Sequence, residues 1–101
     1  MSMITFNDLF PSRSNFCEWM EERDSWFTCV NGDYIGWRRL SEIMDRGSGL
    51  DNIDLKDIDA VTDCLYDVFT HADSQMQDGT AQYLSYVLAG FLHAEVRGRG
   101  S

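Results

Sequence analysis

The stretch DIDAVTDCLYDVF, residues 57–69, carries the clearest structural signal in this chain. Its apolar residues recur in steps of three and four, which places them on one face of a helix that continues to Ala72. The members of this stripe are Ile58, Val61, Leu65, Val68 and Ala72, with Phe69 beside them. The opposite face repeats aspartate at every fourth position, as Asp59, Asp63 and Asp67. The stretch therefore predicts an amphipathic helix with an acidic outer face.

This aspartate repeat is unfavourable for an isolated helix. Like charges at i and i+4 are neighbours, and two such pairs cost about 0.5–1 kcal/mol. Some of the nearby acids have a structural explanation, since Asp54 suits the N-cap and Asp57 the first turn, and Asp59 is borderline. Asp63 and Asp67 remain as acids in the middle of the helix. Two interpretations follow: a surface for a basic partner, or a merely solvated helix face.

The segment SRSNFCEWMEERDSWFTCVNG, residues 12–32, predicts a helix over residues 15–30. Ser12 or Ser14 suits its N-cap, and the Asn-Gly pair suits its end. Asn-Gly is also the strongest short signal for a hairpin turn. The alternative is therefore a short β-hairpin within residues 26–37, with WFTCV and DYIGW as its strands.

Two further helices complete a predicted all-α fold, a compact bundle of about four helices. Their predicted bounds are Asp33 or Tyr34 to Met44, and Asp78 or Thr80 to Val96. Gly47 suits the end of the earlier one. We expect a single domain over residues 1–101, with residues 1–11 as an N-terminal segment and residues 97–101 as a frayed tail.

The last predicted helix is apolar on almost every side. Its core face consists of Ala81, Leu84, Val87, Leu88, Phe91 and Leu92. Tyr83, Tyr86 and Gly90 form a second face. A helix of this kind is usually central in a bundle or shared with another copy of the chain, so this second face is a candidate homodimer interface.

Composition places the chain among soluble globular domains. Of its 101 residues 44% are hydrophobic, which is enough for a core, and no run of 18 apolar residues or signal peptide is present. Cys17, Cys29 and Cys64 cannot all pair with one another, and we expect reduced, mostly buried thiols. We therefore expect a cytoplasmic protein.

The negative charge is strong and concentrated in one segment. The formal net charge is −9, and residues 51–78 hold eight acids, including Asp73, against Lys56 alone. This balance argues against direct binding to nucleic acid or to an anionic membrane. It favours a basic protein surface as the partner, and we predict that Asp73 joins Asp59, Asp63 and Asp67 in the acidic face that binds it.

Motifs for catalysis, cofactors and metals are missing from the sequence. The cysteines and histidines do not have the local spacing of zinc ligands, and no glycine-rich phosphate loop occurs. Cys64, Asp67 and His71 resemble a nucleophile set, but seven residues of helix separate the thiol from the imidazole by about 10 Å. We expect no metal, no cofactor and no enzymatic activity.

Aromatic residues are dense in the first third of the chain, where they alternate with arginine. Most should be buried in the core, but Trp26 and Trp37 are candidates for a weaker, aromatic part of a binding surface. Trp26 lies off the apolar line of Phe16, Met20 and Phe27, so we predict that it is exposed.

No motif identifies a family. In composition and charge placement alone, the chain resembles phage inhibitors of host defence nucleases, such as anti-CRISPR and anti-restriction proteins, and immunity proteins of nuclease toxins. The resemblance implies a non-enzymatic inhibitor that covers the basic surface of a nucleic-acid-handling protein, and it assigns no residue a role. The alternative is a homo-oligomeric adaptor or structural protein, and a small enzyme is third.

The aspartate repeat is too sparse to imitate DNA by itself. It offers one charge per about 6 Å of helix, whereas duplex DNA carries one per about 1.7 Å. We therefore expect the whole acidic segment to meet a basic patch or groove on a protein.

Overall fold

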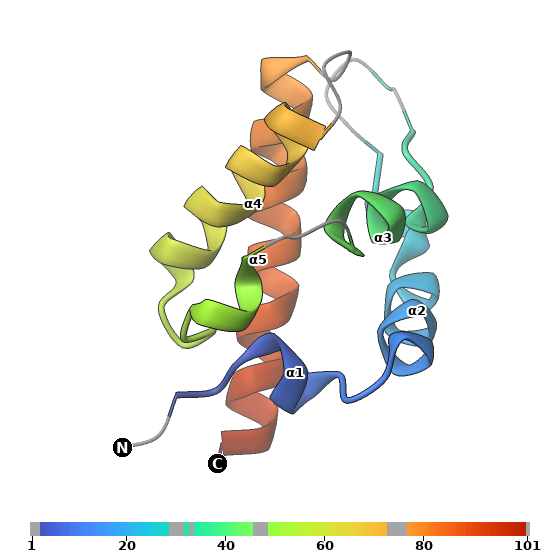
Figure 1. The fold of residues 1–101 in the computed structure, drawn as a ribbon. Coiled ribbons are helices and arrows are strands. Elements are labelled where there is room, and N and C mark those ends of the chain that lie inside the picture. Colours follow the sequence, from blue (N-terminus) through green and yellow to red (C-terminus); the bar gives the residue numbers. More distant parts are fainter. Residues whose placement is uncertain (1–2, 29–31, 33, 46–48, 73–76, 101) are drawn as a thin grey trace.

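The computed structural model describes residues 3–28, 32, 34–45, 49–72 and 77–100 (Figure 1). Helices account for all of the regular structure in these residues, and the predicted all-α class is confirmed. The elements are α1 (Phe6–Leu9), α2 (Arg13–Glu22), the 3-10 helix η1 (Asp24–Trp26), α3 (Trp37–Asp45), the 3-10 helix η3 (Leu50–Asn52), α4 (Ile58–Ala72) and α5 (Asp78–Gly100).

Helix α5 packs mainly against α4, whereas α3 packs against both α2 and α4 (Figure 1). Helices α4 and α5 lie side by side and antiparallel. In α4 the predicted stripe is buried at Val61, Leu65 and Phe69, whereas Ile58 is exposed because it lies at the first residue of the helix. The buried residues of α5 recur at helical spacing and are Thr80, Ala81, Leu84, Ser85, Leu88, Ala89, Leu92 and Val96.

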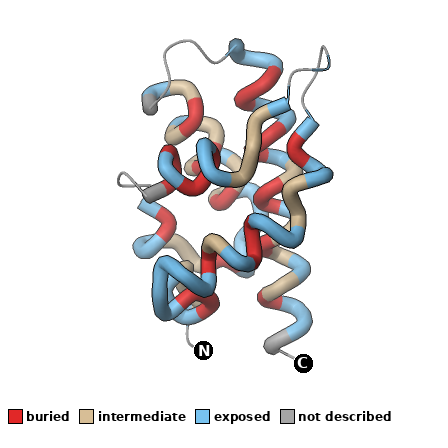
Figure 2. Tube along the Cα trace, turned by 90° about the vertical axis from the view of Figure 1, so that its right-hand side faces the viewer, coloured by how far each residue is buried: buried red, intermediate tan, exposed pale blue. Residues whose placement is uncertain are grey.

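Burial alternates along each helix, as buried and exposed segments of the tube show (Figure 2). The radius of gyration is 12.8 Å, close to the value of about 13 Å for a globular domain of 100 residues. The apolar pattern of the sequence therefore builds one core shared by all the α-helices.

The start of α4 corrects one predicted cap. The Oδ1 atom of Asp57 accepts a hydrogen bond from the backbone N–H of Ala60 at 3.2 Å, so Asp57 caps the helix. Asp54, the predicted cap, instead accepts from the backbone N–H groups of Ile4 at 3.3 Å and Lys56 at 3.1 Å. The carboxylate of Asp54 thus ties the N-terminal segment to the entry of α4.

Residues 1–11 contribute to the core more than their description as an N-terminal segment implies. The carboxylate of Asp8 accepts from the backbone N–H of Thr5 at 2.9 Å and from its hydroxyl at 3.1 Å, and this starts α1. Leu9 and Phe10 at the end of α1 are buried. Because the short helix is fixed locally at its start, it can direct two apolar side chains inward.

The helix predicted over residues 15–30 is wrong beyond Glu22. Helix α2 starts earlier, after the Ser12 cap, and the chain then turns at Arg23 into η1. The physical reason lies in Asp24, whose side chain accepts from the backbone N–H of Trp37 at 3.0 Å instead of supporting further helix. Aspartate readily competes with helical hydrogen bonding in this way.

The hairpin alternative is reduced to one antiparallel bridge between Thr28 and Tyr34. No strand is formed by the described residues. The predicted start of the second helix at Asp33 or Tyr34 is also wrong, because α3 begins at Trp37, where Asp24 caps it. Gly32 has a φ of +77°, the left-handed region that favours glycine. Asn31, Asp33 and the predicted end at Gly47 lie outside the described residues.

The tail predicted to fray over residues 97–101 is instead helical as far as Gly100. Val96, buried one turn earlier, anchors this last part of α5 in the core. Arg97 in the last turns also interacts favourably with the helix dipole.

Candidate protein interaction surface

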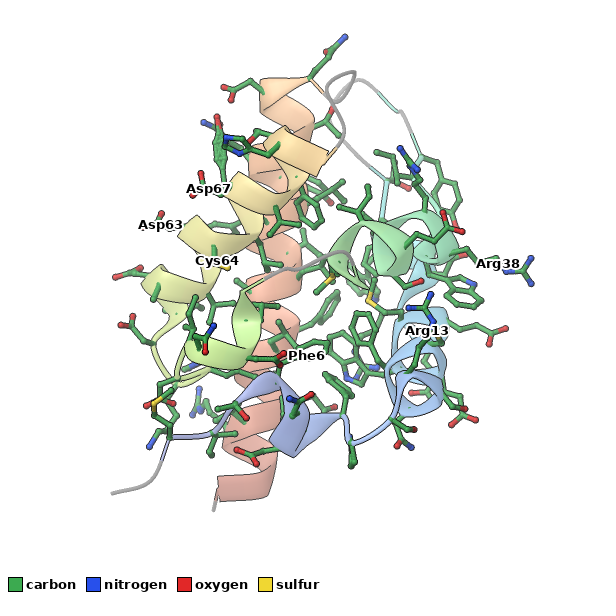
Figure 3. The ribbon with its side chains drawn as sticks, in the orientation of Figure 1. Phe6, Arg13, Arg38, Asp63, Cys64 and Asp67 are labelled. Atoms are coloured by element: carbon green, nitrogen blue, oxygen red, sulfur yellow. The ribbon has the colours of Figure 1, made fainter. Side chains whose placement is uncertain are left out.

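The acidic row, which we define as Asp59, Asp63 and Asp67, lies on the exposed side of α4. Asp63 and Asp67 point away from α5 and from the rest of the protein (Figure 3). Among the described residues, no lysine or arginine forms an ion pair with any of the three. The acidic row therefore presents carboxylates to solvent, and no ion pair within the described part of the chain offsets their repulsion.

Other acids of the segment have structural partners. The Oδ1 atom of Asp78, in the first turn of α5, accepts a hydrogen bond from the Tyr66 hydroxyl. Asp54 forms an ion pair with Lys56 at 3.8 Å. The pKa of its carboxyl is lowered mainly by the hydrogen bond from the backbone N–H of Lys56 and further by that from Ile4. Asp73, predicted to join the acidic face, lies outside the described residues.

Helix α4 also carries the residues that resemble a nucleophile set. The Nδ1 atom of His71 lies 2.8 Å from the backbone oxygen of Asp67, so the contact involves no carboxylate. Burial, and then the charge of Asp67, raise the pKa of the half-buried Cys64 thiol. A thiol with a raised pKa is a poor nucleophile at neutral pH. The arrangement gives no support to cysteine catalysis.

In the described part of the chain, no group of three or more His, Cys, Asp or Glu side chains is placed to hold a metal ion. Cys17 and Cys64 are half-buried thiols, and Cys29 is outside that part.

The two candidate tryptophans lie in different surroundings. Trp26 is 61% exposed, as predicted, and the edge of its ring meets Phe91 of α5 with centroids 6.0 Å apart. Trp37 is half-buried, with the Arg38 guanidinium 5.4 Å from its ring centre. Arg38 extends on the side opposite Asp63 and Asp67 (Figure 3). The aromatic candidates therefore do not extend the acidic row.

The tyrosine strip, which we define as Tyr83, Tyr86 and Gly90, lies on the exposed side of α5. Tyr86 is 76% exposed and Tyr83 is 37% exposed. A Cβ placed on Gly90 would meet no heavy atom within 4 Å. The strip is thus open, as a candidate interface must be.

Two hollows were not predicted from the sequence. The first, of about 510 Å³, lies between α1, the start of α2, the end of α3 and η3. The second, of about 380 Å³, lies between the α1–α2 turn and one side of α2. Both include Phe10 and Pro11 in their walls. One signal was present: Thr5 and Asp8 have the T-x-x-D spacing of a capping box, which places Phe6 and Phe10 one helical turn apart.

Comparison of this chain with family models, with curated proteins and with solved structures finds no match. In the residues described, no helix has the length and apolar character needed to cross a membrane.

Proposed function

We propose that this chain is a non-enzymatic interaction protein that inhibits or neutralises a basic, nucleic-acid-handling protein. The observation that carries the proposal is the acidic row, three exposed carboxylates spaced one helical turn apart that form no ion pair with a lysine or arginine among the residues the structure describes. A partner of this kind implies that the protein acts in the cytoplasm. Phage anti-defence inhibitors and nuclease-toxin immunity proteins are the classes that work in this way.

The energetic cost of the row supports a role in binding. Its two like-charged pairs cost the free protein about 0.5–1 kcal/mol. A basic partner would convert this repulsion into attraction and would speed the encounter, since exposed charges steer association over about 10 Å at 0.1 M salt. Asp63 and Asp67 are the informative members, because Asp59 lies in the first turn and favours the helix dipole.

The partner can be sought and the row tested together. Affinity capture from native lysate, followed by mass spectrometry, identifies the partner. Association is then measured for the parent chain and for the double variant Asp63→Asn, Asp67→Asn at several salt concentrations. We expect the variant to associate about three- to tenfold more slowly at low ionic strength and to show a smaller salt dependence.

A matched control separates the row from net charge. Glu21 of α2 and Glu42 of α3 are exposed acids outside the row, so the variant Glu21→Gln, Glu42→Gln makes the same change in net charge. It should associate as fast as the parent chain. Equal rates for all three proteins would mean that the acidic row is only a solvated helix face.

The tyrosine strip supports a second candidate function, a homo-oligomeric adaptor. Exposed apolar strips on a helix are commonly covered by a second copy of the chain. Light scattering at micromolar concentration should then give twice the mass of 11.6 kDa. Replacing Tyr86 by Glu should restore the monomer. A parent chain that is monomeric at these concentrations would remove this candidate.

A further inference from the structure

The turn at Phe10 and Pro11 separates two adjoining hollows of different chemistry. The first is lined by three phenylalanine rings and Met44, with polar groups at its edge. The second is lined by Leu9, Trp19 and two glutamates. Arg13, part of the first lining, lies on the side of the molecule opposite Asp63 and Asp67 (Figure 3). The hollows are therefore separate from the acidic row.

The first hollow has a firm aromatic wall. The ring centroids of Phe6, Phe10 and Phe16 are 4.9–5.3 Å apart, and each ring contacts the other two. Asp51 lines the edge and is exposed. Arg13 also lines this hollow, where it already has an interaction of its own. A volume of about 510 Å³ with such walls suits one apolar or aromatic side chain and part of its backbone.

The second hollow has an acidic rim. Glu18 and Glu22, one helical turn apart on α2, both line it and are exposed. Glu22 forms an ion pair with Arg23 at 3.5 Å, whereas Glu18 has no ion pair among the described residues. The rim therefore has negative charge available for a cation.

Trp19 forms a buried part of the wall of the second hollow. It is only 7% exposed, and its Nε1 atom, itself buried, has no hydrogen-bond acceptor among the described residues. Because Trp19 lines the hollow, its indole signal can report binding there.

We propose that the two hollows together bind a short extended segment of another protein, in which an apolar or aromatic side chain lies close to an arginine or lysine. The apolar side chain enters between Phe6, Phe16 and Met44. The cation lies against Glu18 and Glu22. This inference does not rest on the acidic row, and each surface can fail without the other.

Charge selects this occupant over an anionic one. Glu18 and Glu22 place two carboxylates at the second hollow, so a phosphate-bearing ligand would meet repulsion there. The lining of the first hollow has one carboxylate, Asp51, and one guanidinium, Arg13, so it does not favour an anion by net charge. The net charge of −9 adds to the repulsion. A basic, partly apolar peptide meets an apolar wall and an acidic rim in adjacent positions.

The test uses two blocked tripeptides as probes, acetyl-Phe-Gly-Arg-amide and its reverse order, acetyl-Arg-Gly-Phe-amide. Proton–nitrogen correlation spectra of the full chain are recorded during titration with each. We expect at least one order to shift the Trp19 indole signal and the amide signals near Phe10 and Asn15 in a saturable manner. The peptide acetyl-Phe-Gly-Glu-amide should bind much more weakly.

Variants separate the site from general charge attraction. Glu18→Gln should weaken binding of the arginine peptide about two- to fivefold, the range for an exposed ion pair. Glu21→Gln removes the same charge from the same helix but does not line the hollow, so it should bind like the parent chain. Because both residues are exposed, neither variant should alter the fold.

Three results would overturn the proposal. One is the absence of saturable shifts around the two hollows with either arginine peptide. Another is equal binding of the glutamate peptide. The third is shifts at these residues on raising the protein concentration without peptide, which would mean that a second copy of the chain covers the hollows. Loss of the salt-dependent effect at Asp63 and Asp67 would leave this site untouched.

Discussion

The α4–α5 pair and the region from α1 to α3 belong to one core but are stabilised in different ways. The pair packs along its length through buried side chains at helical spacing, such as Leu65 and Phe69 of α4. The N-terminal region consists of short helices joined by individual polar contacts. Arg23, for example, donates to the Trp19 carbonyl and to the Glu95 carboxylate, at 3.0 and 3.1 Å.

This difference shows two ways in which a sequence specifies structure. In the pair, many apolar contacts each contribute, and the pattern is repetitive. In the N-terminal region, one side chain often decides where an element begins or ends, as Asp24 does for α3. Stability should therefore depend on buried volume in the pair and on specific hydrogen bonds in the N-terminal region.

The largest effect is expected from truncation within the pair. Phe69 is fully buried, so Phe69→Ala should lower the free energy of unfolding by about 3–5 kcal/mol through lost burial and the cavity that remains. Urea unfolding followed by circular dichroism measures this. Tyr86→Ala removes an exposed ring from α5 and serves as the control, with an expected change below about 0.5 kcal/mol. Similar losses for both would contradict the burial of α4 against α5.

The next effect tests the N-terminal region. Asp24→Ala should cost about 1 kcal/mol, because the backbone N–H of Trp37 loses its acceptor at the start of α3. Ser25→Ala, at the exposed neighbouring residue, is the control.

The substitution Asp24→Ala has a second expected effect, on Tyr34. It removes the hydrogen bond between Tyr34 and Asp24, which is the main cause of the raised pKa of Tyr34. Spectroscopic titration of tyrosine should show that pKa falling toward its ordinary value, and an unchanged pKa would contradict the contact.

A smaller effect of opposite sign is expected on the surface of the pair. Asp63→Asn, Asp67→Asn should raise the free energy of unfolding by about 0.5–1 kcal/mol, since both like-charged pairs of the acidic row disappear. The matched variant Glu21→Gln, Glu42→Gln should change it little. Thermal unfolding at low salt compares the three proteins. A loss of stability in the aspartate variant would mean that these carboxylates have favourable contacts in the free protein.

The smallest effect concerns the link between the two regions. The pKa of Asp54 is lowered from its ordinary value of 3.8, so the native state favours its charged form. The charged Asp54 carboxylate therefore contributes to the free energy of unfolding above pH 3.8, and this contribution is lost as the pH falls through the lowered pKa of the native state. Asp54→Asn should therefore lower the Tm at pH 7 and have less effect at pH 3. An equal difference at both pH values would contradict the lowered pKa.

The predictability of the fold follows the same division. Steps of three and four between apolar residues predicted α4 and α5, because repeated burial averages over local exceptions such as Ile58. The helix expected over residues 15–30 has the same spacing, but Asp24 finds a partner thirteen residues away, and local patterns do not contain that information. Asp57 replaced Asp54 as the cap for the same reason, since Asp54 is engaged by Ile4.

The candidate surfaces divide similarly. The acidic row follows from one helical period and is exposed in the structure. Trp26 is also exposed as predicted, although it lies in η1 and not in the α-helix from which its exposure was predicted. The two hollows combine residues from α1, α2, α3 and η3. Their existence depends on how short elements pack, so the T-x-x-D spacing of Thr5 and Asp8 could indicate the start of α1 but not the hollows themselves.

The place of α5 after the other helices in the chain has a consequence for synthesis of the protein. Trp19 and Phe69 leave the ribosome before α5, yet Trp19 packs against Phe91 of α5, and Phe69 is buried in the core to which α5 contributes. At about 5–20 residues per second, α5 emerges last. Until then the aromatic side chains of the earlier helices lack their cover. Completion of the core is therefore delayed until α5 has been made.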